Sequence, residues 1–244
     1  MIEVSNLRKT FRDVEAVRNL SFHAPDGAIT GLLGANGAGK TTTLRMICGV
    51  LAPDAGAVRI DDREARTVRD RVGALLDHAG LYPRLTVREN LAYFAELQGI
   101  AAPKLGERVA GAIATLGIEA IADRRTDGFS QGERMKTALA RAIIHRPRNV
   151  LLDEPTNGLD VPSVRSLRQI LRRMRDDGQC VILSSHVLEE VRLLCDNVAI
   201  VCEGRVVAQG SPQELCRRTE CESLEDAFIK LTGSEEVSEC LSGR

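Results

Sequence analysis

The stretch Gly34-Ala-Asn-Gly-Ala-Gly-Lys-Thr41 determines how the rest of the sequence is interpreted, because it fits the pattern G-x-x-x-x-G-K-[ST] of a phosphate-binding loop. Residues 29–33, just before it, form a short apolar run typical of a strand. Residues 42–48, just after it, have the pattern of a helix that ends at Gly49. The sequence therefore predicts a phosphate-binding loop between a strand and a helix.

The residue types in this loop suit a nucleoside triphosphate. Glycines let backbone N–H groups curl around phosphates, and the helix N-terminus adds the positive end of its dipole. Lys40 would reach the β- and γ-phosphates, and the Thr41 hydroxyl would bind Mg²⁺. The structural alternative, a glycine-rich turn beside a solvated lysine, is the weaker one because the full pattern stands between a strand and a helix. The predicted nucleotide-binding residues are Gly34, Ala35, Asn36, Gly37, Ala38, Gly39, Lys40, Thr41 and Thr42.

The composition is that of a globular protein without a membrane span. The 244 residues are 43% hydrophobic and 27% charged, and no apolar run approaches 18 residues. The N-terminus lacks the basic and apolar regions of a signal peptide, so we expect a cytoplasmic protein. A net charge of −1, 3% aromatic residues and no Trp argue against a nucleic-acid partner. The seven cysteines form no C-x-x-C pair, which favours reduced thiols.

Apolar segments alternate with helical ones, which predicts a layered α/β domain. Several strands are almost entirely aliphatic, as expected for a parallel sheet covered on both faces. About residues 86–146, the pattern is helical only, and we interpret this part as a helical lobe inserted into the sheet order. The polar segment 233–244 is expected to be a flexible tail after a single domain at 1–232. The candidate strands are residues 29–33, 58–60, 72–76, 150–152, 181–183, 198–201 and 206–208.

Two carboxylates follow the apolar strand at residues 149–152. In open α/β sheets, ligands lie beyond the carboxyl ends of the strands, so Asp153 and Glu154 would reach the phosphate site. Asp153 suits a magnesium shell, because hard cations take carboxylate oxygens. Glu154 could orient or polarise the attacking water. An acidic turn after a strand would be the favoured interpretation for this segment alone, but beside a phosphate-binding loop it is the weaker one.

Two further polar segments could meet a phosphate. His186 follows the apolar run 181–183 and could bond the γ-phosphate, although a lone histidine at a strand end is more often structural. Ser130 and Glu133 have the spacing of a capping box ahead of an amphipathic helix, and Thr86 and Glu89 share it. A free helix N-terminus is also an anion site. For Ser130, the residues alone leave both roles open.

Taken together and in this order, the segments resemble the ATP-binding subunit of an ATP-binding cassette transporter over nearly the whole chain. Residues 34–41 look like the Walker A motif and residues 150–154 like Walker B. Phe-Ser-Gln-Gly-Glu at 129–133 looks like the family signature, usually LSGGQ. Residues 158–160 look like the D-loop, and His186 is at the switch-histidine position. The resemblance implies a P-loop NTPase core with a mostly parallel sheet, an N-terminal antiparallel β portion and an inserted helical lobe.

The resemblance also assigns roles to single residues. Phe11, ahead of Val17, matches the aromatic residue that stacks on adenine, and both are expected at the nucleotide. Asp77 occupies the position where the family usually has a glutamine that contacts Mg²⁺ and senses the membrane partner; an aspartate is shorter and charged. We expect Thr41, Asp153 and Asp77 at the metal and Lys40, Glu154 and His186 in catalysis. Ser130, Gly132 and Asp160 are expected to contact nucleotide.

The implied function is hydrolysis of ATP with Mg²⁺ to energise a membrane transporter. Two ATPase subunits, identical or paralogous, would pack head to tail around ATP, and transmembrane permease subunits would hold them at the inner face of the membrane. Export-type ATPases are the closest likeness within the family, and the segment 77–91 is expected to dock on the permease. The alternative is a soluble cassette ATPase that acts on ribosomes or DNA. A catalytically idle regulator is less favoured, since the catalytic positions are intact.

Overall fold

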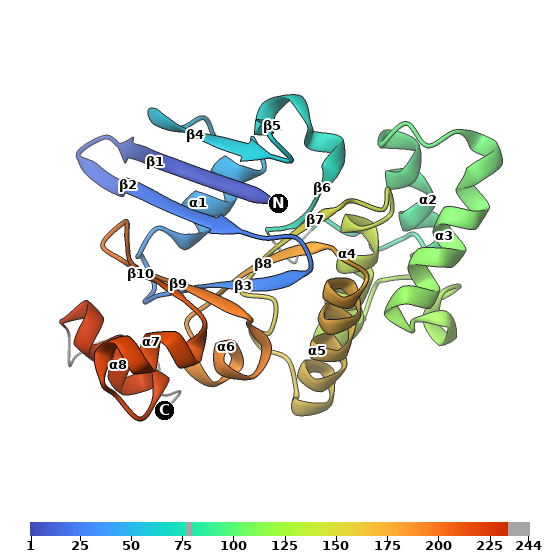
Figure 1. Cartoon of the computed structure of the whole chain (residues 1–244). Helices are drawn as coiled ribbons and strands as arrows, with labels where there is room; N and C mark the ends of the chain where they lie inside the picture. The colour runs from blue at the N-terminus through green and yellow to red at the C-terminus, as the bar shows by residue number, and fades with distance from the viewer. Residues whose placement is uncertain (77–79, 234–244) are drawn as a thin grey trace.

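The computed structural model describes residues 1–76 and 80–233, so that Asp77 and the predicted tail after Gly233 lie outside the described residues. Two β-sheets with helices packed on them make up the fold (Figure 1). The strands are β1 (Ile2–Phe11), β2 (Val14–Ala24), β3 (Ala28–Leu33), β4 (Ala55–Ile60), β5 (Arg63–Glu64), β6 (Val72–Leu75), β7 (Asn149–Asp153), β8 (Cys180–Ser185), β9 (Asn197–Cys202) and β10 (Arg205–Gly210).

Eight α-helices lie within the described ranges. They are α1 (Lys40–Ile47), α2 (Val87–Leu97), α3 (Ala102–Leu116), α4 (Gln131–Ala142), α5 (Val161–Asp176), α6 (Leu188–Leu194), α7 (Pro212–Thr219) and α8 (Leu224–Thr232). Short 3-10 turns occur at η1 (Ala65–Thr67), η2 (Arg69–Arg71) and η3 (Glu119–Ile121). No helix in residues 1–76 and 80–233 is long and apolar enough to cross a membrane.

The larger sheet has the order β10-β9-β3-β8-β7-β6 and is parallel except for the β10–β9 pair. Its central strands are buried on both faces, as their aliphatic sequences predict. In β8, Val181 and Leu183 belong to one hydrophobic cluster and Cys180 and Ile182 to another, because side chains alternate across a strand. The expected mostly parallel sheet is confirmed.

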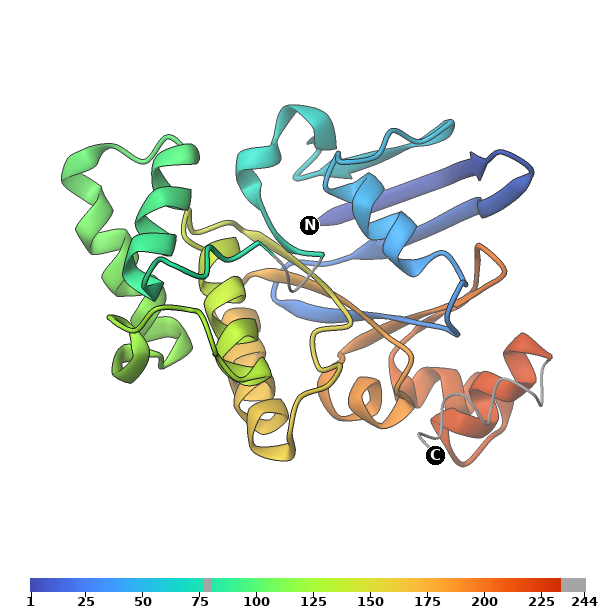
Figure 2. The same ribbon diagram turned by 180° about the vertical axis from the view of Figure 1, so that it is seen from behind.

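The N-terminal sheet is antiparallel, with the order β2-β1-β4-β5, as the resemblance implied. Predicted strand 58–60 is the end of β4 and belongs to this sheet. Helix α1 lies between the two sheets, where Leu44 and Ile47 share a cluster with Ile2 of β1 and Ile182 of β8 (Figure 2). The helix that carries the phosphate-binding loop is therefore clamped between two β layers.

The helices α2, α3 and α4 lie within the predicted lobe, and α2 and α3 extend from one end of the molecule (Figure 1). Both predicted capping boxes are formed. Thr86 Oγ1 accepts from the N–H of Glu89 at 3.2 Å, and Ser130 Oγ accepts from the N–H of Glu133 at 3.2 Å. Leu91, Met135 and Leu139 of the lobe share one cluster with the sheet residues Leu75 and Val150, so the lobe and the sheet have a common core.

Candidate nucleotide-binding site

The predicted phosphate-binding loop connects β3 to α1. Gly39 has φ 100° and Gly37 φ 83°, a region that favours glycine. A Cβ on Gly39 would lie 2.5 Å from the carbonyl oxygen of Ala16, and a Cβ on Gly34 would lie 2.3 Å from that of Val201. These two glycines are therefore required by close backbone approach, and Gly37 only by its conformation.

Lys40 begins α1 with its side chain almost fully buried. Its Nζ donates to the carbonyl oxygens of Gly34 at 2.7 Å and Ala35 at 3.1 Å, and it lies 3.4 Å from Glu154 Oε1. The ammonium group is thus held against the backbone of the loop, next to Glu154 at the end of β7. Around it, the other loop residues differ in exposure: Asn36 and Gly37 are exposed, Ala38 is buried, and Ala35, Thr41 and Thr42 are half-buried.

The carboxyl ends of β3, β8 and β7 lie side by side, because the parallel register pairs Leu33 with Ser185 and Asp153 with Ser184. Ser184 bridges the two predicted carboxylate positions. Its hydroxyl donates to Asp153 Oδ1 at 2.5 Å and accepts from the N–H of Glu154 at 2.9 Å. One buried hydroxyl therefore fixes both the Asp153 carboxylate and the backbone of Glu154.

Glu154 leaves the strand with φ 46°, a left-handed conformation that is uncommon for a non-glycine residue. This turn brings its side chain between Lys40 and His186. Its Oε2 lies 2.8 Å from Nδ1 of His186, and its Oε1 faces Lys40. Oε1 is buried and accepts no hydrogen bond among the described residues. A carboxylate oxygen that accepts no hydrogen bond keeps its lone pairs available, here 3.4 Å from the Lys40 ammonium group.

Phe11 and Val17, the residues expected at the adenine, lie in the hairpin of β1 and β2. Val17 is fully buried and packs beside Gly39, whose Cβ would meet its side chain at 3.4 Å. Phe11 ends β1 with 46% exposure, and Lys9 Nζ lies 5.7 Å from its ring centroid. Lys9 of β1 pairs with Val17 of β2, and Phe11 follows Lys9 by two residues. Phe11 therefore lies near the part of β2 that packs beside Gly39 of the phosphate-binding loop.

The signature segment lies apart from the loop. Helix α4 packs on α2, α3 and β6, whereas α1 packs on β7, β1 and β2. Ser130 caps α4 and also donates to Glu133 Oε2 at 3.0 Å, while a Cβ on Gly132 would lie 2.5 Å from Ser163 Oγ. Asp160 caps α5 and accepts from the N–H of Ser163 at 3.0 Å, and its hydrogen bonds with Ser163 lower the pKa of its carboxyl.

The sequence predicts that Lys40, Asp153, Glu154 and His186 lie together beyond the carboxyl ends of the strands, and the structure places them there. It assigned no role to Ser184, although that residue ends an apolar run and the polar change was the available signal. It also missed the contact between the Thr156 hydroxyl and Glu190 Oε2, which ties the loop after β7 to α6. No signal in the sequence pairs those two residues, because they lie 34 positions apart.

Comparison with known proteins gives consistent matches. The family model described as "ABC transporter" matches residues 17–157. The ABC transporter ATP-binding protein NatA of Bacillus subtilis (strain 168) is 37% identical, over 94% of this chain and 97% of that protein. The Nod factor export ATP-binding protein I of Paraburkholderia xenovorans (strain LB400) is 38% identical, over 88% and 72%. A solved ATP-binding subunit of an ABC transporter has a TM-score of 0.85 and 26% identity, over 95% of this chain and 99% of that one.

Proposed function

This chain belongs to the ABC transporter family as an ATP-hydrolysing subunit, and from that premise we propose that it drives export across a membrane. The name of the Nod factor export ATP-binding protein, a relative of this chain, supports the outward direction. The proposal treats residues 1–232 as one cassette domain with a helical lobe at about 86–146. Binding of the transported substrate is assigned to other subunits.

The observation that carries the hydrolytic part of the proposal is the position of Glu154. Its carboxylate lies between Lys40 and His186, and its buried Oε1, 3.4 Å from Lys40 Nζ, accepts no hydrogen bond among the described residues. We assign Glu154 as the general base that takes the proton of the attacking water. Lys40 would neutralise charge on the β- and γ-phosphates, and His186 would hold Glu154 and bond the γ-phosphate.

The residues present fit a magnesium ion. Thr41 supplies a hydroxyl and Asp153 a carboxylate whose other interaction is with the Ser184 hydroxyl, and hard cations take such oxygens. The described residues contain no cluster of three His, Cys, Asp or Glu that could hold a metal. Phosphates and water would therefore complete its shell, as is usual for Mg²⁺. When bound, the ion would stabilise charge that develops on the phosphates.

ATP is proposed to join two copies of the chain, or this chain and a paralogue, head to tail. Support comes from the separation of α1 from α4: the loop and the signature segment are built on different parts of the fold. Ser130 and the N-terminus of α4 present hydrogen-bonding groups at the surface, and a second subunit could bring a phosphate to them. Loss of the γ-phosphate after hydrolysis would weaken this contact and open the dimer.

The permease is proposed to dock on the face around residues 80–91, beside the helical lobe. Asn90 is fully buried and holds this segment rigid: its amide donates to the carbonyl oxygens of Tyr82, Leu85 and Thr86, and it accepts from the N–H of Tyr82. Tyr82 remains 46% exposed, and Tyr93, whose ring meets it edge-on at 5.2 Å, is 40% exposed. Exposed aromatic side chains on a rigid segment suit a protein interface.

The test is a pull-down of the tagged chain from detergent-solubilised membranes of its own cell, with the co-purifying proteins identified. A multi-helix membrane protein at near-equal amount is expected, and Tyr82→Ser should reduce its yield. The matched control is Val14→Ser, at a residue of the β1–β2 hairpin that is 66% exposed. This variant should leave the yield of the membrane protein unchanged. Ribosomal proteins or DNA-repair factors in place of a membrane protein would overturn the proposal in favour of a soluble cassette ATPase.

A further inference from the structure

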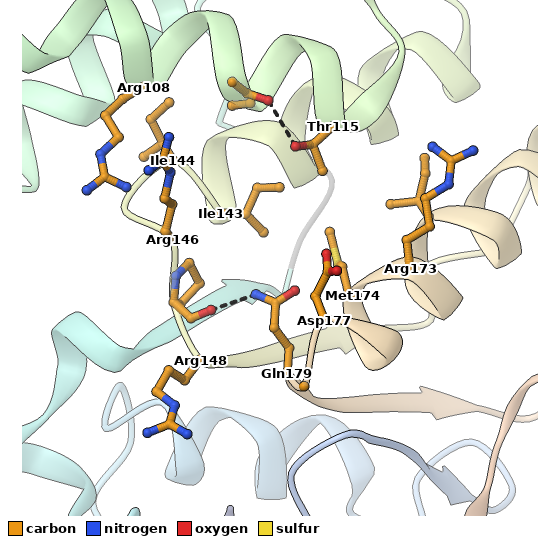
Figure 3. A pocket seen from close by; sticks show the side chains of 15 residues that line it. Arg108, Thr115, Ile143, Ile144, Arg146, Arg148, Arg173, Met174, Asp177 and Gln179 are labelled. Atoms are coloured by element: carbon orange, nitrogen blue, oxygen red, sulfur yellow. Dashed lines mark hydrogen bonds between the residues drawn. The ribbon is translucent and has the colours of Figure 1, made fainter.

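A cavity of about 650 Å³ lies at the opposite edge of the larger sheet from the nucleotide site. Arg148 and Gln179 line it from positions just before β7 and β8, whereas the catalytic residues follow the other ends of these strands. Its other walls come from α3, α5 and the loop before β7 (Figure 3). This volume is within the range of small-molecule pockets. We name it the arginine pocket.

The lining of the arginine pocket is strongly basic, although the whole chain has a net charge of −1. The lining contains four arginines, Arg108, Arg146, Arg148 and Arg173, and a single acidic residue, Asp177. An anion in this pocket would therefore meet a concentrated positive potential that the chain as a whole does not have.

The arginines differ in how far their charge is already satisfied. Arg146 pairs with Glu107 at 2.9 Å, and Arg148 lies 3.9 Å from Asp26. The guanidinium groups of Arg108 and Arg173 have no hydrogen bond or ion pair with any residue that the structure describes. For Arg108 this matters most, because its Nη1 atom is buried and without a hydrogen-bond partner. A buried donor left unpaired costs free energy that a bound anion would recover.

The middle of the pocket is apolar. Ile143 and Met174 lie between the side of the pocket that bears Arg108 and the side that bears Arg173 (Figure 3). Gly111 keeps the α3 wall open, since a Cβ there would meet only the Arg146 guanidinium, at 3.6 Å. A ligand that fits therefore needs an anionic group for Arg108 and a short apolar body for the residues beside it.

We propose that the arginine pocket binds an organic phosphate, with the phosphate on Arg108 and the apolar portion on Ile143 and Met174. Planar guanidinium groups match phosphate geometry, which makes phosphate the favoured anion. Either a soluble metabolite or the headgroup of an acidic lipid could supply this chemistry. Because α3 and α5 both line the pocket, the bound molecule ties the helical lobe to α5, which packs on β3 and β8 of the larger sheet.

The test is calorimetric titration of the full chain with hexyl phosphate, with the phosphate-binding loop saturated by ADP and Mg²⁺ throughout. Wild-type protein should bind, and Arg108→Gln should weaken binding at least about tenfold, the scale of one lost charge-assisted hydrogen bond. Gly111→Leu should also abolish binding, because it fills the pocket while every arginine remains. The matched control, Arg205→Gln at an exposed residue of β10, should bind like the wild type.

A vesicle experiment identifies the source of the phosphate, and two outcomes of the titration would contradict the proposal. Sedimentation with phosphatidylglycerol vesicles, if it depends on Arg108, assigns the phosphate to a lipid headgroup; hexyl phosphate binding without sedimentation assigns it to a soluble molecule. Binding that survives both Arg108→Gln and Gly111→Leu, or that Lys40→Ala removes, would overturn the proposal. Since Glu154 takes no part in this pocket, ATP hydrolysis can fail or persist independently of the outcome.

Discussion

The catalytic edge and the signature segment are built in opposite ways. At the edge, polar groups find partners across strands: Ser184 reaches Asp153, and Glu154 reaches both Lys40 and His186. At the signature segment, the partners are local, since the hydroxyl and the N–H of Ser130 bond only to Glu133 among the described residues. We propose that the first arrangement is a reacting centre assembled by one chain. The second is a capped helix that gains a further role only when another molecule brings a phosphate to it.

The largest expected effect comes from breaking the catalytic edge at its proton acceptor. Glu154→Gln keeps the shape of the side chain and one oxygen beside His186 but removes the basic carboxylate. We expect ATP turnover to fall at least ~100-fold, the usual scale for a lost general base, while ATP binding persists and an ATP-bound dimer accumulates. Phosphate release and size-exclusion chromatography with ATP measure the two effects.

The control for this variant is Glu189→Gln. That glutamate belongs to nearby α6 but is exposed and pairs with Arg192 at 2.7 Å, so its loss should leave turnover unchanged. Undiminished turnover in Glu154→Gln would contradict the assignment of Glu154, whatever the control does.

A smaller effect is expected when the signature segment is changed, and a second capping box provides its reference. Ser130 and Ser211 each accept from an N–H three residues on, at 3.2 Å in both cases. Ser130→Ala and Ser211→Ala should each lower the free energy of unfolding by about 1 kcal/mol, the usual cost of a lost N-cap. Only Ser130→Ala should also lower turnover, by about tenfold, because it removes a donor to a charged phosphate.

Chemical denaturation and steady-state hydrolysis separate the two roles of Ser130. Equal losses of stability with unequal losses of turnover would show that the capping box also serves a phosphate. If turnover falls equally in both variants, Ser130 is only a cap, and the proposed head-to-tail arrangement loses its main residue.

The fold was predictable where burial leaves a simple pattern. Aliphatic strands such as 150–152 and 181–183 are covered on both faces, so their sequences carry no polar alternation, and β7 and β8 contain them. The pattern did not delimit β1 and β2 as strands. Their exposed residues, among them Ser5 and Arg8, interrupt the apolar signal, because one face of the antiparallel sheet is open to solvent.

The candidate site was predictable where it depends on strand ends, and less so where it depends on register. Lys40 begins α1, Asp153 ends β7 and His186 follows β8, so the parallel topology alone brings them together. The role of Ser184 depends on its pairing with Asp153, a long-range register that no local pattern encodes. Asp77, the remaining predicted metal contact, lies outside the described residues and stays a prediction.

The smallest expected effect concerns how the helical lobe is attached to the sheet. His145 follows α4 and bonds the carbonyl oxygen of Val72 on β6 through Nε2 at 3.2 Å. Burial lowers the pKa of His145 below its ordinary value of 6.5; Arg108 lowers it further, whereas the bond to Val72 and the charge of Asp70 oppose the shift. The unfolded chain therefore takes up this proton first as the pH falls. The contribution of His145 to the free energy of unfolding is complete above about pH 6.5. It is lost as the pH falls toward the folded-state pKa, with a slope of at most about 1.36 kcal/mol per pH unit for one proton.

His145→Gln, which can still donate to Val72, should flatten the fall in unfolding free energy between pH 7.5 and 5.5. His23→Gln, at an exposed histidine, should not. An unchanged acid profile in His145→Gln would mean that the junction between lobe and sheet does not depend on a neutral His145. Acid sensitivity would then have to come from elsewhere, and the catalytic edge, with its carboxylates at Asp153 and Glu154, would be the next place to test.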